Sequence, residues 1–223
     1  MSRSRPSSVR RPRVERLEAR HLLAGLTVSS SADDGPGSLR AAIEAADLDT
    51  TTPVVEIDFA IGGGGPATID LRAALPTITR PVFINGSTQS DDAGSPEIVI
   101  DGCKTPAGSN GLTIAGGSST VERVQIRGFA GIASQSSTDG GRGILLTGAG
   151  GDLLIGNQVG GFGVGDGNAI GVEVDAADAT IGGGAGLGNA ISGNGNAGYI
   201  DNAFDNVISA DVKGTGIQGQ RAL

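Results

Sequence analysis

Residues 111–114 read Gly-Leu-Thr-Ile, and this arrangement returns three times further along the chain. It opens the segments Gly143-Ile144-Leu145-Leu146, Gly171-Val172-Glu173-Val174 and Gly198-Tyr199-Ile200-Asp201, at spacings of 32, 28 and 27 residues. A recurrence at this period is typical of a solenoid. Short apolar alternations separated by Gly and Asn turns indicate strands rather than helices. Residues 111–219 are therefore predicted to form coils of a parallel β-helix.

Equivalent residues of successive coils stack about 4.8 Å apart in such a fold. One inward column is predicted to hold Leu112, Ile144, Val172 and Tyr199, and a second to hold Val121, Leu153, Ile181 and Ile208. The outward column of the first strand holds Thr113, Leu145, Glu173 and Ile200. No chemistry repeats in that outward column, which argues against an array-type binding face on this strand. In the last coil, Asp201 takes an inward site that apolar residues fill in the other coils.

The composition agrees with a solenoid. Aromatic residues make up 3% of the chain and hydrophobic residues 38%, with Gly 40 and Pro 9 among the 223 residues. A narrow stack of aliphatic side chains does not need large rings. Beyond residue 20 the chain carries nine basic and 22 acidic residues, so nucleic acid is not an expected partner. The single Cys103 excludes an internal disulfide, and the absence of a long apolar run predicts no membrane span.

The first 25 residues differ sharply from the rest. Residues 1–20 hold seven Arg and two Glu, a net charge of +5, and are predicted to form a disordered basic leader. The apolar run Leu22–Leu26 is too short for a secretory signal. Leu17, Glu18, Arg20, Leu22 and Leu23 nevertheless resemble the Leu-Glu-Pro-Arg-x-Leu-Leu box of large exported bacterial proteins, with Ala19 in place of Pro. The resemblance implies export; a plain disordered tail and a nucleic-acid-binding arm are the alternatives.

Residues 26–50 are predicted to form a short strand and one helix. Ser38 is a candidate N-cap, and the apolar face of the helix consists of Leu39, Ala42, Ile43 and Ala46. A helix this short needs a surface to lie on. One end of a β-helix offers an apolar surface that must be covered. We expect a capping helix, and an ordinary surface helix is the alternative.

Several motifs resemble the pectin-lyase-like surface proteins of bacteria. They are the Asp-Gly-Pro-Gly-Ser-Leu-Arg-Ala-Ala-Ile box at 34–43, Leu-Pro-x-Ile-Thr followed by x-Pro-Val-x-Ile-x-Gly within 75–86, and Ile-Asp-Gly at 100–102. The resemblance implies an all-β, right-handed parallel β-helix with a short N-terminal capping helix. The expected organisation is a leader at 1–25, a strand and capping helix at 26–50, and a β-helix at 51–223. The last coil has no cap, which predicts a truncated end that self-associates.

Four residues form a candidate calcium site on one turn. Relative to the opening Gly, the third and fourth coils place Asp175 and Asn202 at one position and Asp178 and Asp205 at another. Stacked carboxylates repel each other unless a cation lies between them, and Ca²⁺ prefers six to eight oxygen ligands from loops. The competing interpretation is that Asp and Asn are ordinary turn residues on a solvated edge.

No catalytic constellation emerges from the sequence. The one histidine, His21, lies in the leader, and the basic residues of the repeats are expected to be solvated: Arg123, Arg127, Arg142 and Lys213. The sequence therefore favours an exported, non-catalytic scaffold or adhesion-type surface protein. Its expected partners are a polysaccharide or another surface protein, with weak glycan or Ca²⁺ binding. The alternative is a polysaccharide lyase or glycoside hydrolase, which needs Asp and Arg or Lys convergent on neighbouring coils.

Overall fold

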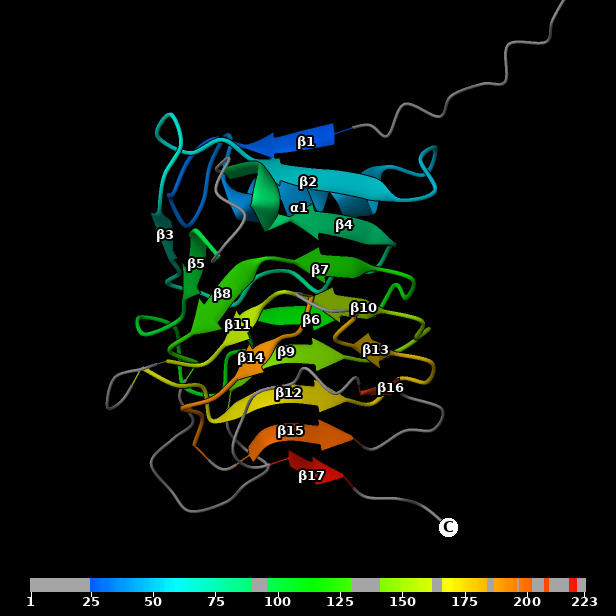
Figure 1. The fold of residues 1–223 in the computed structure, drawn as a ribbon. Helices are drawn as coiled ribbons and strands as arrows, with labels where there is room; N and C mark the ends of the chain where they lie inside the picture. Colours follow the sequence, from blue (N-terminus) through cyan, green and yellow to red (C-terminus); the bar gives the residue numbers. More distant parts are fainter. Residues whose placement is uncertain are drawn as a thin grey trace, which may run out of the picture.

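The fold is a parallel β-solenoid. The structure, a computed structural model, describes residues 25–89, 96–129, 141–161, 166–183, 187–195, 197–201, 207–208 and 217–219, and the side chains of these residues as far as residue 195. Each strand pair in these ranges is parallel, and the strands stack into three sheets along one axis (Figure 1). The all-β class and the solenoid are thus confirmed, while the right-handed winding stays a prediction.

Each full coil contributes one strand to each of three sheets, named A, B and C here. Sheet A consists of β1 (Gly25–Val28), β2 (Val55–Phe59), β4 (Val82–Asn85), β7 (Thr120–Glu122), β10 (Leu153–Ile155), β13 (Thr180–Ile181) and β16 (Val207–Ile208). Sheet B consists of β3 (Ala67–Asp70), β5 (Ile98–Asp101), β8 (Val124–Arg127), β11 (Gln158–Val159) and β14 (Ala190–Ile191). Sheet C consists of β6 (Leu112–Ile114), β9 (Arg142–Leu146), β12 (Ile170–Val174), β15 (Ala197–Asp201) and β17 (Ile217–Gly219).

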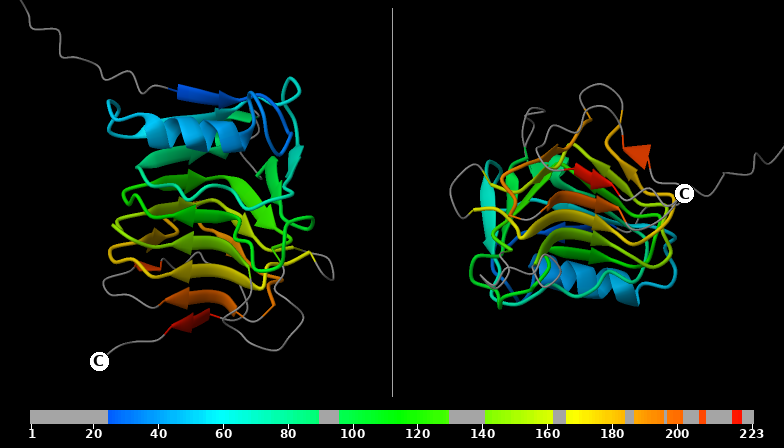
Figure 2. Two further views of the ribbon diagram at one scale, coloured as in Figure 1. Left: turned by 180° about the vertical axis from the view of Figure 1, so that it is seen from behind. Right: turned by 90° about the horizontal axis from the view of Figure 1, so that it is seen from below.

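The α-helix α1 (Leu39–Leu48) lies at the β1 end of the stack, and Figure 2 shows it from behind. Ser38 caps it, because the Ser38 Oγ accepts a hydrogen bond from the Ala41 backbone N–H at 3.2 Å. The predicted apolar face is buried as expected: Leu39, Ala42, Ile43 and Ala46. A short 3-10 helix, η1 (Gly86–Gln89), follows β4. Neither of these helices is long and apolar enough to cross a membrane, and the described ranges contain no other that is.

Aliphatic columns fill the interior. Leu112, Ile144 and Val172 are in register and fully buried, as predicted, and the Tyr199 backbone continues their column. Two further buried columns run along sheets A and B. They consist of Ile57, Ile84, Val121, Leu154 and Ile181, and of Ile69, Ile100, Ile126, Val159 and Ile191. Each such side chain contributes about 1.5–3 kcal/mol on burial.

One core residue was predicted wrongly. Leu154, not Leu153, pairs with Val121 and Ile181, and the Leu153 side chain lies half-buried on the outer side. The preceding turn is one residue longer than those of the coils above and below, with Gly150 and Gly151 both at φ +75°. Because side chains alternate along a strand, one additional residue exchanges the inward and outward positions.

The Gly that opens each of the first two predicted repeats, Gly111 and Gly143, is required by close packing. A Cβ at Gly143 would lie 2.6 Å from the Asn168 Nδ2 and 2.6 Å from the Val159 Cγ1, far inside van der Waals contact. The strand of sheet C can therefore approach the corner between sheets B and C only where a side chain is absent. The recurring Gly marks this corner rather than a flexible turn.

Asparagines hold the corner between sheets A and B. The buried Asn157 accepts a hydrogen bond from the Val124 N–H at 3.1 Å and donates to the Val121 carbonyl at 2.8 Å. Asn189, one coil further, accepts from the Asn157 N–H at 2.9 Å and donates to the Leu154 carbonyl at 2.7 Å. The amide side chains thus replace the ladder partners that the backbone loses where the chain turns.

A second asparagine ladder holds the corner between sheets B and C. Asn168 accepts from the Phe129 N–H and donates to the Ile126 carbonyl, both at 3.1 Å. Asn194 accepts from the Asn168 N–H at 3.1 Å and donates to the Val159 carbonyl at 3.0 Å. The two ladders use the same pattern of bonds, so the coils are joined at both corners by side chains of one type.

Replacement of Asn157 by Ala is expected to lower the free energy of unfolding by about 2–4 kcal/mol, because it removes the side-chain partner of the Val124 N–H and of the Val121 carbonyl and one of the two hydrogen bonds that the Asn189 Oδ1 accepts. Gln158→Ala, at the neighbouring half-buried outward position, is the matched control. Denaturant unfolding measures both variants. Equal and small losses in the two would contradict a structural role for the ladder.

Candidate functional site

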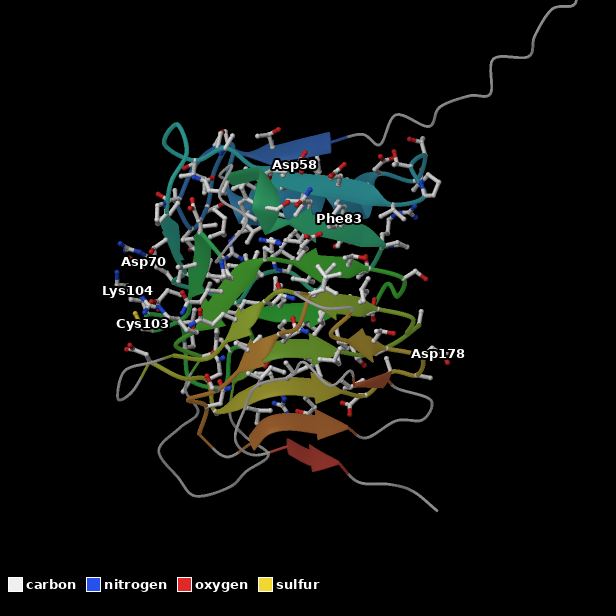
Figure 3. All side chains as sticks on the ribbon, viewed as in Figure 1. Asp58, Asp70, Phe83, Cys103, Lys104 and Asp178 are labelled. Atoms are coloured by element: carbon white, nitrogen blue, oxygen red, sulfur yellow. The ribbon has the colours of Figure 1, made fainter. Side chains whose placement is uncertain are left out.

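The outward side of sheet A carries polar and aromatic chemistry on three neighbouring strands. We call it the acidic-aromatic face, and it consists of Glu56, Asp58, Phe83, Asn85, Thr120 and Glu122. Its residues form two columns, because Glu56 pairs with Phe83 and Phe83 with Thr120, while Asp58 pairs with Asn85 and Asn85 with Glu122. All six side chains are half-buried. Figure 3 shows Asp58 and Phe83 close together on this face.

Two carboxyl groups of β2 lie side by side on this face. Burial, the charge of Glu56 and a hydrogen bond with Glu56 together raise the pKa of Asp58 above its ordinary value. The Asp58 Oδ1 is buried and makes no hydrogen bond within the described residues. The pair therefore tends to hold a proton or to attract a donor.

Asn85 and Glu122 extend the polar column to the next two strands. The Asn85 Nδ2 donates to the Glu56 Oε1 at 3.1 Å, and the Asn85 Oδ1 accepts from the Ser87 hydroxyl. The Glu122 Oε1 lies 3.5 Å from the Arg123 Nε, an ion pair at the strand end. Arg123 has a φ of +52°, and this turn brings its backbone against Gly86, where a Cβ would clash with the Arg123 carbonyl. The face thus has fixed hydrogen-bonding groups around one aromatic ring.

A second charged cluster lies where β5 and β8 end. Asp101 is the register partner of Arg127, and the Arg127 Nε lies 3.0 Å from the Asp101 Oδ2. The Arg127 Nε makes no hydrogen bond within the described residues, so its contact with Asp101 is an ion pair without a hydrogen bond at this nitrogen. Asp166 adds a more distant carboxylate, 3.9 Å from the Arg127 Nη1. Asp101 is buried, and its Oδ1 accepts from the Cys103 N–H at 2.9 Å.

Lys104 and Cys103 lie at the margin of this cluster (Figure 3). The Lys104 Nζ donates to the Asp70 Oδ2 at 2.6 Å, between two half-exposed side chains. A hydrogen bond to Asp101 raises the pKa of the exposed Cys103 thiol, so this thiol is less reactive than a free cysteine. The cluster combines Asp and Arg or Lys from neighbouring coils, which is the convergence that the sequence did not reveal.

The basic residues expected to be solvated are engaged in contacts. Arg127 pairs with Asp101, and the Arg142 Nε donates to the Glu173 Oε2 at 2.5 Å across sheet C. Glu173 belongs to the predicted outward column, yet it is buried. Lys213 lies outside the described residues. A comparison of strand ends, Ile98–Asp101 with Val124–Arg127, would have revealed the first pair, because the alternating apolar residues align Asp101 with Arg127.

The predicted calcium site is only half within the described part of the chain. Asp175 and Asp178 lie exposed in the turn between β12 and β13, where Asp178 has a left-handed φ of +59°. Asn202 and Asp205 lie outside the described residues. The described residues contain no group of three His, Cys, Asp or Glu that could hold a metal ion. Because two of its four ligands are not described, the Ca²⁺ site stays a prediction.

One buried carboxyl group, that of Asp152, forms its hydrogen bond in the interior rather than at a surface site. Asp152 is 1% exposed, and its Oδ1 accepts from the Ser119 N–H at 2.9 Å. The Ser119 Oγ in turn accepts from the Val82 N–H at 3.2 Å, so the bonds follow one column along sheet A. The Asp152 Oδ2 has no partner within the described residues. Burial raises the pKa of Asp152, although the Ser119 N–H opposes this shift.

The sequence matches no protein-family model and no curated protein. The geometry of the chain's own residues therefore carries the functional argument.

Replacement of Asp152 by Asn is expected to stabilise the protein at neutral pH. The folded-state pKa of Asp152 is raised, so its contribution to stability is present below the unfolded-state pKa of about 3.9 and declines as the pH rises through the raised value. Asn keeps the acceptor for Ser119 and does not ionise. The difference in melting temperature between variant and parent should be small near about pH 3 and grow toward pH 7.

Thermal unfolding across this pH range measures that difference. The titration of groups common to both proteins contributes equally to each and cancels in the difference. Asp70→Asn, at a half-exposed carboxylate, is the control. A difference in melting temperature that is constant with pH, or a variant that is less stable than the parent at pH 7, would show that ionisation of the buried Asp152 does not destabilise the fold.

Proposed function

We propose that the protein is an exported, non-catalytic β-solenoid scaffold of the adhesion type that binds polysaccharide on its acidic-aromatic face. The observation that carries the proposal is the position of Phe83. Its ring lies outward on β4, in register with Glu56 and next to Asn85. An aromatic ring offers an apolar surface to one side of a sugar, while carboxylates and amides accept or donate to its hydroxyl groups. The aromatic ring, the carboxylates and the amide are adjacent on this face.

The rigidity of the face supports recognition. Its residues lie on strands rather than loops, and the inward neighbours Val82 and Ile84 are fully buried. Binding therefore requires little ordering of the protein, which reduces the entropic cost of association. The face spans three strands, a width of about 10 Å from β2 to β7, so it suits a short stretch of a chain rather than a long groove.

The geometry of the carboxyl pair supports a non-catalytic role. Glycosidases that use two carboxyl groups hold them about 5 Å or more apart, because a sugar carbon or a water molecule must fit between them. Glu56 and Asp58 instead lie two residues apart on the same side of one strand, and Asn85 donates to the Glu56 Oε1. Side by side on β2, they accept sugar hydroxyl groups from one direction but do not flank a glycosidic bond.

The export part of the proposal rests on the leader. The resemblance of residues 17–23 to an export box supports delivery to the cell envelope or beyond. Another surface protein is the alternative partner for the solenoid at that location.

A second candidate function is depolymerisation of uronate polysaccharides, favoured by the Asp101–Arg127 cluster. Arg127 would contact the substrate carboxylate, with Asp101 and Asp166 as neighbouring acids. Against it, Arg127 is already paired with Asp101, and an arginine stays protonated and so is a poor proton acceptor.

Phe83→Ala is expected to weaken polysaccharide binding about fivefold or more, because it removes the one aromatic surface of the face. Leu153→Ala is the matched control, since Leu153 also lies half-buried and outward on sheet A, two strands further on. Affinity electrophoresis on a panel of neutral and uronate polysaccharides gives the readout. The absence of any retarding polysaccharide, or equal retardation of Phe83→Ala and parent, would contradict the proposal.

The two candidate functions are separated by an assay for unsaturated uronate ends, with and without added Ca²⁺. The non-catalytic proposal expects no release of such ends by the parent protein. Release that is abolished by Arg127→Lys and unaffected by Phe83→Ala would establish the second candidate instead. Arg142→Lys, at an ion pair on sheet C, is the control for loss of an arginine contact.

A further inference from the structure

The acidic-aromatic face has an unmet requirement for a cation or hydrogen-bond donor. Glu56 and Asp58 are adjacent carboxyl groups, and the buried Asp58 Oδ1 makes no hydrogen bond within the described residues. Asn85 donates a hydrogen bond to one oxygen of Glu56, and Arg123 forms an ion pair with Glu122 at the far end of the column. A guanidinium group is suited to such a pair, because its parallel N–H groups bind two carboxylate oxygens at once.

The chain carries such groups in the segment that leads into this face. Residues 1–20 contain seven Arg against two Glu. The described structure begins at Gly25, the first residue of β1, and Gly25 is the register partner of Glu56. A Cβ at Gly25 would lie 3.7 Å from the Asp58 Oδ2. The basic segment therefore joins the fold directly beside the carboxyl pair.

The segment is long enough to cover the whole face. Glu122 lies on β7, three strands from β1, which corresponds to about 14 Å at the usual spacing of strands. The five residues from Arg20 to Gly25 span up to about 17 Å when extended. Arg20 and Arg16 can thus each reach any carboxylate of the face, and the remaining Arg residues lie further out along the same segment.

We propose that the Arg-rich segment of residues 1–24 docks on the acidic-aromatic face of its own chain, with guanidinium groups on Glu56, Asp58 and Glu122 and over the Phe83 ring. The docked segment pairs opposite charges and covers the aromatic surface with cation–π contact. The inference goes beyond the proposed function, since it holds whether or not the face binds polysaccharide.

Limited trypsin digestion of the full chain tests the docking. Cleavage after the Arg residues of the segment is followed by intact mass. The triple variant Glu56→Gln/Asp58→Asn/Glu122→Gln should lose the segment about fivefold faster than the parent at low salt, because three partly exposed ion pairs are removed. The charge-matched control Glu44→Gln/Asp70→Asn/Asp178→Asn removes three acids away from the face and should behave as the parent. At about 0.5 M NaCl the parent should approach the rate of the face variant.

Equal cleavage of parent and face variant at low salt would overturn the proposal. A protection that decreases on dilution would also overturn it, because it would place the segment on a second copy of the chain. Should the triple variant fail to fold, a nitroxide at Ser7→Cys in the Cys103→Ser background provides an independent measurement. Line broadening of the β2, β4 and β7 amides by this label is expected, and broadening no greater than that of the β12 amides would contradict docking.

Discussion

The fold depends on how the chain turns its corners without losing backbone hydrogen bonds. Strands stack readily, but the peptide groups between two sheets point away from the ladder and would be buried without partners. Asn157 with Asn189 and Asn168 with Asn194 supply those partners from side chains. Gly111 and Gly143, at the starts of two sheet C strands, let the backbone approach one of these corners. The aliphatic columns can close-pack only because both requirements are met at the same positions.

The sequence predicts the solenoid well because the pattern that forms it is local. Leu112, Ile144 and Val172 each follow an opening Gly and recur after 32 and 28 residues, so their common column follows from counting. The same counting is wrong at Leu153, where the turn with Gly150 and Gly151 has one residue more than its neighbours. Register is set by pairing between coils, and a change of one residue in a turn does not alter the local pattern of the strand that follows.

The candidate sites were harder to predict, because each combines residues of different coils. Phe83 and Glu56 are 27 residues apart, and Asp101 and Arg127 are 26 apart, in coils whose turns differ in length. The repeats recognised in the sequence began only at Gly111, so the coils containing β2, β4 and β5 were not aligned with the rest. A pattern of strands separated by Gly and Asn turns also does not distinguish Asn157 and Asn189, which are buried and bonded on several sides, from exposed turn residues. The leader and two of the four predicted calcium ligands lie outside the described residues and keep the status of predictions.

The acidic-aromatic face occupies only the coils nearest α1, and the outward residues of sheet A further along are Leu153, Ile155 and Thr180. In a solenoid each coil contacts only its neighbours, so coils can be gained or lost at a distance without disturbing such a face. The geometry of the face and the length of the stack are thereby separable properties of one chain. Duplication of the later coils would lengthen the stack by whole coils, while the face near α1 would keep its geometry.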